Sequence, residues 1–268
     1  MMTDPTAAPA DIAAPADIAA NADIAANALD AEAPAASPAP AATELAVTEP
    51  PRDCPLCPRL AAFRAEQRLA HPDWHNAPVP VFGDGDAWLA IVGLSPGLKG
   101  GNRTGRTFDA EKGGGTLYGT LLAFRLAHDH VDIGTADDLV LDGVVTIDAV
   151  RCVPPNNQPT KDELLTCRPF LAAPLAALPE LRVVVALGED AHRSAVKALG
   201  GKLPKAPYAA MADHRFPSGV WLIDCAPLAT DGVGIDAAVL EAVIARALVL
   251  RSMAEGRTDG RADGDPAE

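Results

Sequence analysis

The chain has 268 residues and a formal net charge of −14, a length that accommodates one large α/β domain or two small ones with a substantial core. Most of the acid lies at the two ends, because residues 1–53 carry a net −8 and residues 254–268 a net −3, which leaves −3 for the middle. The overall charge therefore does not exclude a nucleic-acid partner, since local basic loops can still meet phosphate.

The two ends of the chain differ in composition from the middle. Residues 1–51 are rich in Ala and Pro and contain the tandem hexads ADIAAP and ADIAAN, and residues 254–268 alternate Gly, Asp and Arg. Such segments bury too little apolar surface to offset their ordering entropy, so we expect both to be disordered and residues 52–253 to form the folded domain. The start of the chain has no basic leader and no apolar run reaches membrane-spanning length, which predicts a cytoplasmic protein with no membrane partner.

Four cysteines fall in two distant pairs. Cys54 and Cys57 form a C-x-x-C, and Cys152 and Cys167 follow about a hundred residues later. In a reducing cytosol such thiols are typical of a metal centre, either zinc or an iron–sulfur cluster, and unconnected buried thiols are the alternative. Cys225 follows a strand-like run and is interpreted as a small buried hydrophobe.

Short apolar runs alternate with helical patterns along residues 87–251. The runs predicted as strands are Ala87–Val92, Val144–Val150, Arg182–Leu187 and Val220–Asp224. The segments predicted as helices are Thr116–His128, a stretch within Lys161–Leu178 broken or kinked near Pro169 and Pro174, Glu189–Leu199 and Ile235–Arg251. This alternation predicts a parallel sheet covered by helices on both faces, with ligands bound beyond the carboxyl ends of the strands.

The loop after the first strand is rich in glycine and basic residues. Glycines let a backbone approach an anion, and Lys99, Arg103 and Arg106 supply positive charge. Phe108 either stacks on a planar base or is tucked into the core.

Polar residues also follow the later strands. Asp148 ends the second strand, and Asn157 or Thr160 can cap the helix that carries Cys167. Ordinary structural or solvated roles are favoured for the histidines, including His192 and His214.

Four segments together resemble a known family: CPLCPRL, GLSPGLKGGNRTGRTF, AVRCVPPNNQPTKDELLTCRPFL and VVVALG. Over about residues 53–224 the chain resembles the bacterial type-5 uracil-DNA glycosylases, of the iron–sulfur branch of the uracil-DNA glycosylase superfamily. The resemblance implies a three-layer α/β/α fold with a central, mostly parallel four-stranded sheet. It also implies a [4Fe-4S] cluster on Cys54, Cys57, Cys152 and Cys167, and excision of a base that is swung out of the duplex.

The resemblance further implies roles for individual residues. Phe108 would stack on the flipped base, and the backbone at Ser95, Pro96 and Gly97 would line its pocket. Glu111 stands where the family has a catalytic Asp and would position water. The residues expected to meet DNA phosphates are Lys99, Asn102, Arg103 and Arg106.

Two positions depart from the family pattern. Asp148 stands where the family usually has Asn, and an ionised Asp can only accept hydrogen bonds, whereas Asn can accept from uracil N3–H and donate to O4. Two facing acceptors cost about 1–3 kcal/mol or force the pKa of the carboxyl upward, and such a site tolerates an amino group such as cytosine N4 better. Ala226 stands at the position of the family's final His, which removes the usual contact to the leaving base.

Three functions are compatible with these patterns. The leading hypothesis is a monomeric DNA glycosylase acting on uracil or another deaminated base, with specificity shifted by Asp148. The alternatives are a non-catalytic iron–sulfur module that binds DNA lesions, and a zinc-stabilised α/β domain unrelated to DNA.

Overall fold

The computed structural model describes residues 49–108, 114–129, 139–228 and 236–256. Most of the two segments expected to be disordered lies outside these ranges. The folded part begins before residue 52, because Glu49 already accepts hydrogen bonds from Val81 N and from the Arg151 guanidinium. No helix in the described ranges is long and apolar enough to cross a membrane.

The main sheet has six strands in the order β1-β5-β2-β6-β8-β7. The four central strands β5, β2, β6 and β8 run parallel, and the short edge strands β1 and β7 are antiparallel to their neighbours. Their bounds are β1 Phe82–Gly83, β2 Leu89–Gly93, β5 Val144–Asp148, β6 Val183–Leu187, β7 Asp213–Arg215 and β8 Trp221–Cys225. The prediction of four parallel strands is confirmed to within a few residues at each end, and the two edge strands widen that sheet.

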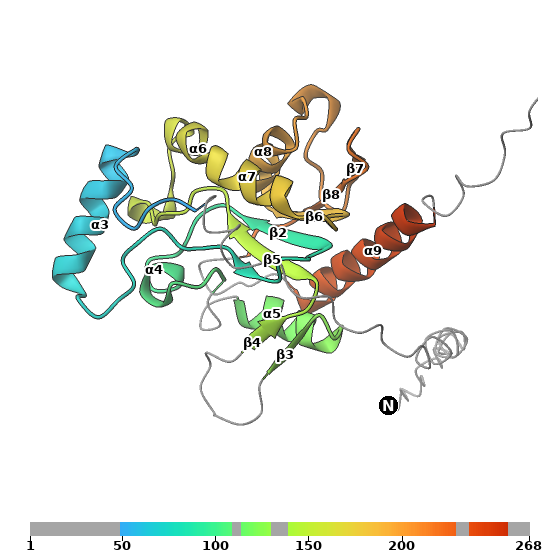
Figure 1. Cartoon of the computed structure of the whole chain (residues 1–268), viewed down its shortest axis with the longest axis horizontal. Helices are drawn as coiled ribbons and strands as arrows, with labels where there is room; N and C mark the ends of the chain where they lie inside the picture. The colour runs from blue at the N-terminus through green and yellow to red at the C-terminus, as the bar shows by residue number, and fades with distance from the viewer. Residues whose placement is uncertain (1–48, 109–113, 130–138, 229–235, 257–268) are drawn as a thin grey trace, which may run out of the picture. The chain divides into compact units, whose positions relative to one another are not determined.

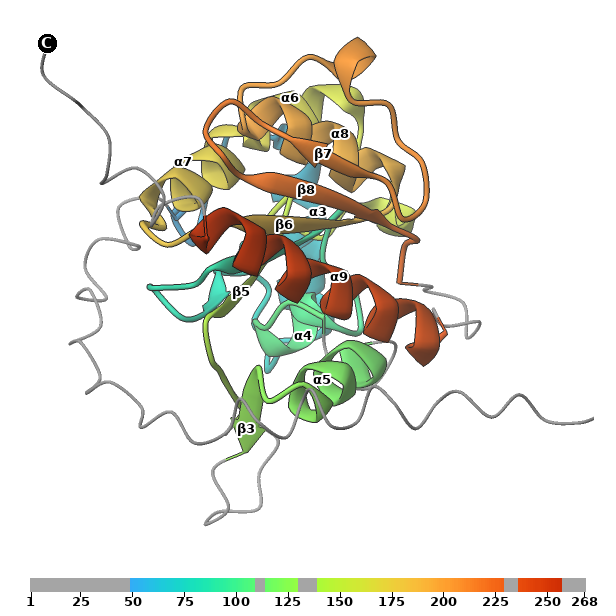
Figure 2. The same ribbon diagram turned by 90° about the vertical axis from the view of Figure 1, so that its right-hand side faces the viewer.

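Helices cover both faces of this sheet, which gives the expected three layers (Figures 1 and 2). One face packs against α5 (Gly114–Ala123) and α9 (Ala237–Glu255), and the other against α7 (Pro169–Ala177) and α8 (Glu189–Ala198). The central strands are rich in Val, Ile, Leu and Ala, and almost all of their residues are buried. A strand buried on both faces needs this composition, which is why its sequence is a continuous apolar run.

The helical segment after Cys152 is divided by prolines. Helix α6 (Lys161–Cys167) begins with a capping box between Thr160 and Glu163, and α7 starts anew at Pro169. The predicted break at Pro169 is thus confirmed, whereas α7 continues through Pro174. Because Pro174 has no N–H, it leaves the carbonyl of Phe170 without its helical donor, and Arg151 Nη1 donates to that oxygen at 3.1 Å.

Three parts of the fold differ from the expectation. Helix α3 (Pro58–Ala70) was not predicted. Helix α5 ends at Ala123 instead of reaching His128, and Arg125 follows with a left-handed φ of 57°. The chain then enters β3 (Ala127–Asp129), which pairs with β4 (Leu139–Leu141) in a small antiparallel sheet. The remaining elements are the short helix α4 (Gly101–Thr104) and the 3₁₀ turns Pro155–Asn157 and Leu203–Lys205.

Candidate functional site

The loops that leave β2 and β5 lie side by side at the carboxyl edge of the sheet. Gly93 and Asp148 are register partners at the ends of the two strands. Beyond them, Ala149 N donates to Gly93 O and Val150 N to Leu94 O, both at 2.9 Å. The two loops predicted to carry the site therefore start from one shared backbone ladder.

Three residues from these loops converge on one point. A Cβ built on Gly93 would lie 2.4 Å from Asp148 Oδ1 and 2.7 Å from Phe108 Cζ. Only glycine fits there, because real Cβ atoms do not approach other atoms so closely. The aromatic ring and the carboxyl that were predicted to hold a base thus face the same backbone position.

Hydrogen bonds from β5 and α5 fix the backbone just before Phe108. Thr107 Oγ1 lies 2.5 Å from Thr146 Oγ1, and Tyr118 OH donates to the Thr107 carbonyl at 2.5 Å. Phe108 itself has a left-handed φ of 52°, is half-buried and packs against the core cluster of α5 and α9. The ring is therefore both a partial core residue and a neighbour of Asp148, so the two expectations for it are not exclusive.

Asp148 is an unusual carboxyl for a strand end. Its side chain is almost completely buried, with 2% of the residue exposed. Burial raises the pKa of the Asp148 carboxyl to about 7, and the nearby Arg151 guanidinium offsets only part of this effect. Near neutral pH the group therefore exists as both acid and carboxylate.

The loop that follows β2 and carries Lys99, Arg103 and Arg106, called the basic loop from here on, folds as a compact turn around α4. Gly97 O accepts hydrogen bonds from Gly100 N and Asn102 N, and the turn ends at Gly105, whose φ of 79° and contact with the His75 ring exclude a side chain. Ser95 and Gly97 are half-buried and Pro96 is buried beneath this turn.

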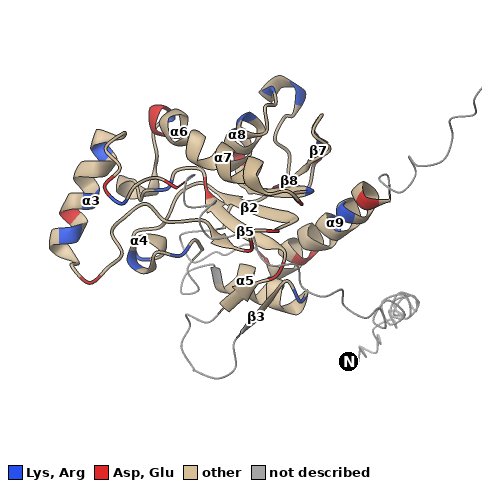
Figure 3. Cartoon of the chain, in the orientation of Figure 1, with Lys and Arg blue, Asp and Glu red and all other residues tan. Residues whose placement is uncertain are grey.

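Side chains of the basic loop have different surroundings. Lys99 is exposed and Arg103 half-buried, and Figure 3 shows the basic positions on α3 and α4. The Arg106 guanidinium lies 5.6 Å from the Phe82 ring centre and 5.8 Å from that of Tyr118.

Asn102 does not face solvent as a phosphate contact would. Only 1% of the residue is exposed, and its Nδ2 donates to Asn76 Oδ1 at 2.8 Å. The backbone carbonyls of Asn102 and Arg103 accept hydrogen bonds from Asn76 N and His75 N. This arrangement assigns Asn102 to holding the loop in shape.

The four predicted cysteine ligands line one pocket. Cys54 and Cys57 come from the segment before α3, Cys152 from the loop after β5, and Cys167 from the end of α6. Burial raises the pKa of Cys152 to about 11 and that of Cys167 to about 12, so without a metal these groups hold their protons. The fifth cysteine, Cys225, is 1% exposed within the core, as predicted.

The spacing of the four sulfurs bears on which metal they suit. A tetrahedral zinc ion with Zn–S bonds of about 2.3 Å holds its sulfurs about 3.8 Å apart. Among the residues that the structure describes, three ligand atoms of His, Cys, Asp or Glu lie within 4.8 Å of one another only at His192, His214 and Asp224. No three of the four cysteine sulfurs form such a group, so as they stand they do not make the compact tetrahedron of a single zinc ion.

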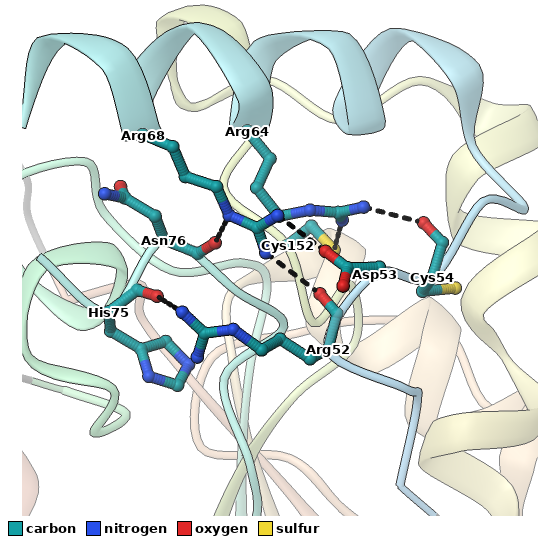
Figure 4. Close-up of polar contacts among 8 residues, drawn as sticks. All are labelled: Arg52, Asp53, Cys54, Arg64, Arg68, His75, Asn76 and Cys152. Atoms are coloured by element: carbon teal, nitrogen blue, oxygen red, sulfur yellow. Dashed lines mark hydrogen bonds and ion pairs between the residues drawn. The ribbon is translucent and has the colours of Figure 1, made fainter. Parts of the chain in front are cut away.

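Arginines on and just before α3 form polar contacts with Cys152 and with the chain around Cys54 and Asn76 (Figure 4). Arg64, which is 5% exposed, donates to Cys152 Sγ at 3.6 Å and to Cys54 O at 2.9 Å. Arg68 joins Asp53, next to Cys54, to the carbonyl of Asn76. The cysteine pocket and the basic loop are thus connected through Arg68 and the Asn76–Asn102 contact.

The loop after β8 contains Ala226 at the position where the family resemblance implies a histidine. Ala226 is half-buried and Pro227 packs against Gly188. Asp224 points to the α8 face of the sheet, where its carboxylate lies 2.5 Å from His192 Nδ1 and 3.1 Å from His214 Nε2. Asp148 and Phe108 lie on the opposite face of the sheet, so neither histidine faces them.

Some site residues were not evident from the sequence. The buried Arg64, the His192–Asp224–His214 cluster and the brace formed by Asn76 all depend on partners distant in the chain. Conversely, Glu111, predicted to position water, lies outside the described residues.

Comparisons with known proteins find a matching family model and several relatives. The family model described as "Uracil DNA glycosylase superfamily" matches residues 80–239. A type-5 uracil-DNA glycosylase from Thermus thermophilus is 40% identical over 176 residues, which cover 63% of this chain and 80% of the relative. Proteins of the same name from Pyrobaculum aerophilum and Mycobacterium bovis are each 36% identical, over 55% and 64% of this chain and 67% of each relative.

Proposed function

The chain belongs to the uracil-DNA glycosylase superfamily, and we propose that it removes uracil or another deaminated base from DNA by hydrolysing the N-glycosidic bond. The observation that carries this proposal is the convergence of the Phe108 ring and the Asp148 carboxyl on Gly93 at the carboxyl edge of the sheet. A planar base swung out of the duplex needs a ring to stack on and polar groups to read its edge, and this position supplies both.

The reaction makes three demands on the chain. The departing base carries negative charge, the sugar develops positive charge, and water must arrive on the other face of the sugar. In this proposal Phe108 stacks on the base, backbone N–H groups at Ser95–Gly97 bind it, and Glu111 positions the water.

In this proposal the basic loop binds the DNA backbone. Lys99, Arg103 and Arg106 bind phosphates, and Asn102 keeps the loop in shape by its contact with Asn76. Phosphate contacts orient the duplex without reading its sequence, so in this proposal base selection is left to Asp148 and Phe108.

The leaving base lacks the hydrogen bond that a histidine would donate, because the side chain of Ala226 has no donor. His192 and His214 are engaged with Asp224 on the other face of the sheet, so in this proposal the backbone N–H groups of Ser95 and Gly97 take the place of that donor. We therefore expect slower chemistry than a site with a His donor would allow, by about 100-fold if one charge-stabilising donor is lost.

We further propose that Cys54, Cys57, Cys152 and Cys167 hold a [4Fe-4S] cluster. Such a cluster supplies a structural cross-link here, because it joins the segment before α3 to β5 and α6, and metal binding of this kind is coupled to folding. Cys152→Ala should lose iron and solubility together; a soluble, fully active variant would contradict this role. The proposal includes a monomeric, cytoplasmic protein whose partner is damaged DNA.

The test is a panel of oligonucleotide duplexes containing uracil, hypoxanthine or only normal bases, incubated with the iron-loaded protein. Abasic sites in the uracil or hypoxanthine duplex, with strong loss in Glu111→Gln, are the expected result. Glu66→Gln makes the same change at an exposed position of α3 and should leave activity intact. Tight binding to the damaged duplex without abasic product, unchanged by Glu111→Gln, would instead identify a lesion-binding module.

A further inference from the structure

The carboxyl of Asp148 is almost completely buried but keeps a small contact with solvent, because its oxygens are not among the fully shielded, unpaired side-chain atoms of the described residues. None of the residues that the structure describes donates a hydrogen bond to it, although 98% of the residue is shielded from solvent. A carboxyl that has no donor among the described residues, faces Phe108 over Gly93 and still reaches solvent can take its hydrogen-bond partner from a ligand.

The charged and titratable neighbours of Asp148 are few among the described residues. Arg151 comes from the loop after β5, but its guanidinium donates to Val79 O, Phe170 O and Glu49 Oε2. Tyr118 comes from α5 and donates to the Thr107 carbonyl. Neither group is bonded to the Asp148 carboxyl, so the described residues leave its hydrogen-bonding capacity unused.

The two protonation states of Asp148 present different patterns to that base. The neutral acid has one O–H donor and one carbonyl acceptor, as the amide of Asn does. Uracil offers N3–H beside O4, and hypoxanthine offers N1–H beside O6, so a neutral acid satisfies both groups of either base. The carboxylate accepts only, and it places a second acceptor against the base carbonyl.

We propose that Asp148 reads the N–H and C=O edge of deaminated bases only when it is protonated, so that a single proton on this side chain gates recognition. This inference rests on the proposed function and adds a specificity element to the same site. The position of the carboxyl supports it, and the raised pKa of about 7 places the gate within the working range of a cytoplasmic enzyme.

The experiment follows recognition and cleavage separately. Single-turnover excision of uracil and affinity for a duplex with a non-cleavable 2′-fluoro-deoxyuridine are measured from pH 5.5 to 8.5, for the wild type and for Asp148→Asn. Above the ionisation both wild-type quantities should fall about tenfold per pH unit, or about thirtyfold at pH 8.5 relative to pH 6. Asp148→Asn keeps a donor and an acceptor at every pH, so its affinity for the same duplex should stay level.

The outcomes distinguish the gate from the function. Activity that is independent of pH in the wild type, or a fall that is the same in Asp148→Asn, overturns the gate while leaving the glycosylase intact. Absence of product from both proteins at every pH contradicts the proposed function, and the affinity series still tests the gate. Asp190→Asn, an exposed change on α8, controls for the loss of one carboxylate and should behave as the wild type.

Discussion

Replacing Asp148 with Asn should make the stability of the protein depend less on pH. The carboxyl ionises near 3.8 in an unfolded chain and near 7 in the folded protein, because burial favours the neutral form. Between these values the unfolded chain releases a proton that the folded protein keeps. Wild-type stability therefore declines as pH rises from about 4 to about 7 and is level above that range.

The size of this effect follows from the two pKa values. A shift of about three units is at most about 4 kcal/mol of stability lost above pH 7. About 2 kcal/mol of this is already lost at pH 5, so the advantage of Asp148→Asn should grow by about 2–3 kcal/mol between pH 5 and pH 8. For a domain of this size that corresponds to about 5–10 °C in melting temperature.

The assay is thermal unfolding of the iron-loaded protein under anaerobic conditions, with wild type and Asp148→Asn compared in the same buffers from pH 5 to pH 8. A difference in melting temperature between the two proteins that is the same at every pH does not bear on the prediction. Only the way in which that difference changes with pH tests it. Asp190→Asn shows how much of that change comes from the loss of one surface charge. A difference that stays constant across the range, or that widens toward acid, would refute the reasoning.

Two further changes probe the pocket and the cysteine centre. Gly93→Ala places a methyl group against Asp148 and Phe108, and an overpacking strain of about 1–3 kcal/mol should reduce uracil excision by about 5- to 150-fold. Iron content, measured by absorbance, and affinity for undamaged duplex, measured by anisotropy, should stay unchanged. Normal excision would show that no base enters there. Arg64→Met removes the hydrogen bonds to Cys152 Sγ and Cys54 O, so the absorbance of the proposed cluster should decay faster in air than it does in Arg59→Met, whose arginine on the same helix bonds Glu163 instead. Equal decay rates would argue against a role for Arg64.

The parts of the fold that could be predicted are those with a local signature. The strands β2, β5, β6 and β8 are buried on both faces, so each is a continuous apolar run that the sequence displays. The break before Pro169 follows from the missing N–H of proline. The two-residue strand β1 and the three-residue strand β7 have no such pattern, because backbone pairing with a neighbour defines them.

The parts of the site that were missed depend on distant partners. Asn102 resembles any polar loop residue, and only its contact with Asn76, 26 positions earlier, shows that it is buried. Helix α3 is held by pairs such as Arg59 with Glu163, which are 104 residues apart. The facing positions of Phe108 and Asp148, by contrast, follow from the rule that ligands bind where parallel strands end, together with the family resemblance.

Direct detection of the released base tests the central claim that a nucleobase is taken out of DNA and cut from its sugar at the Gly93 position. Iron-loaded protein in excess is mixed at pH 6.5 with a duplex containing one uracil, and free uracil is separated by chromatography and quantified over time. We expect one uracil per duplex from the wild type, and a rate at least tenfold lower when Phe108→Ala removes the stacking ring. Duplex recovered intact after prolonged incubation with wild-type protein, with no free base in solution, would contradict the account.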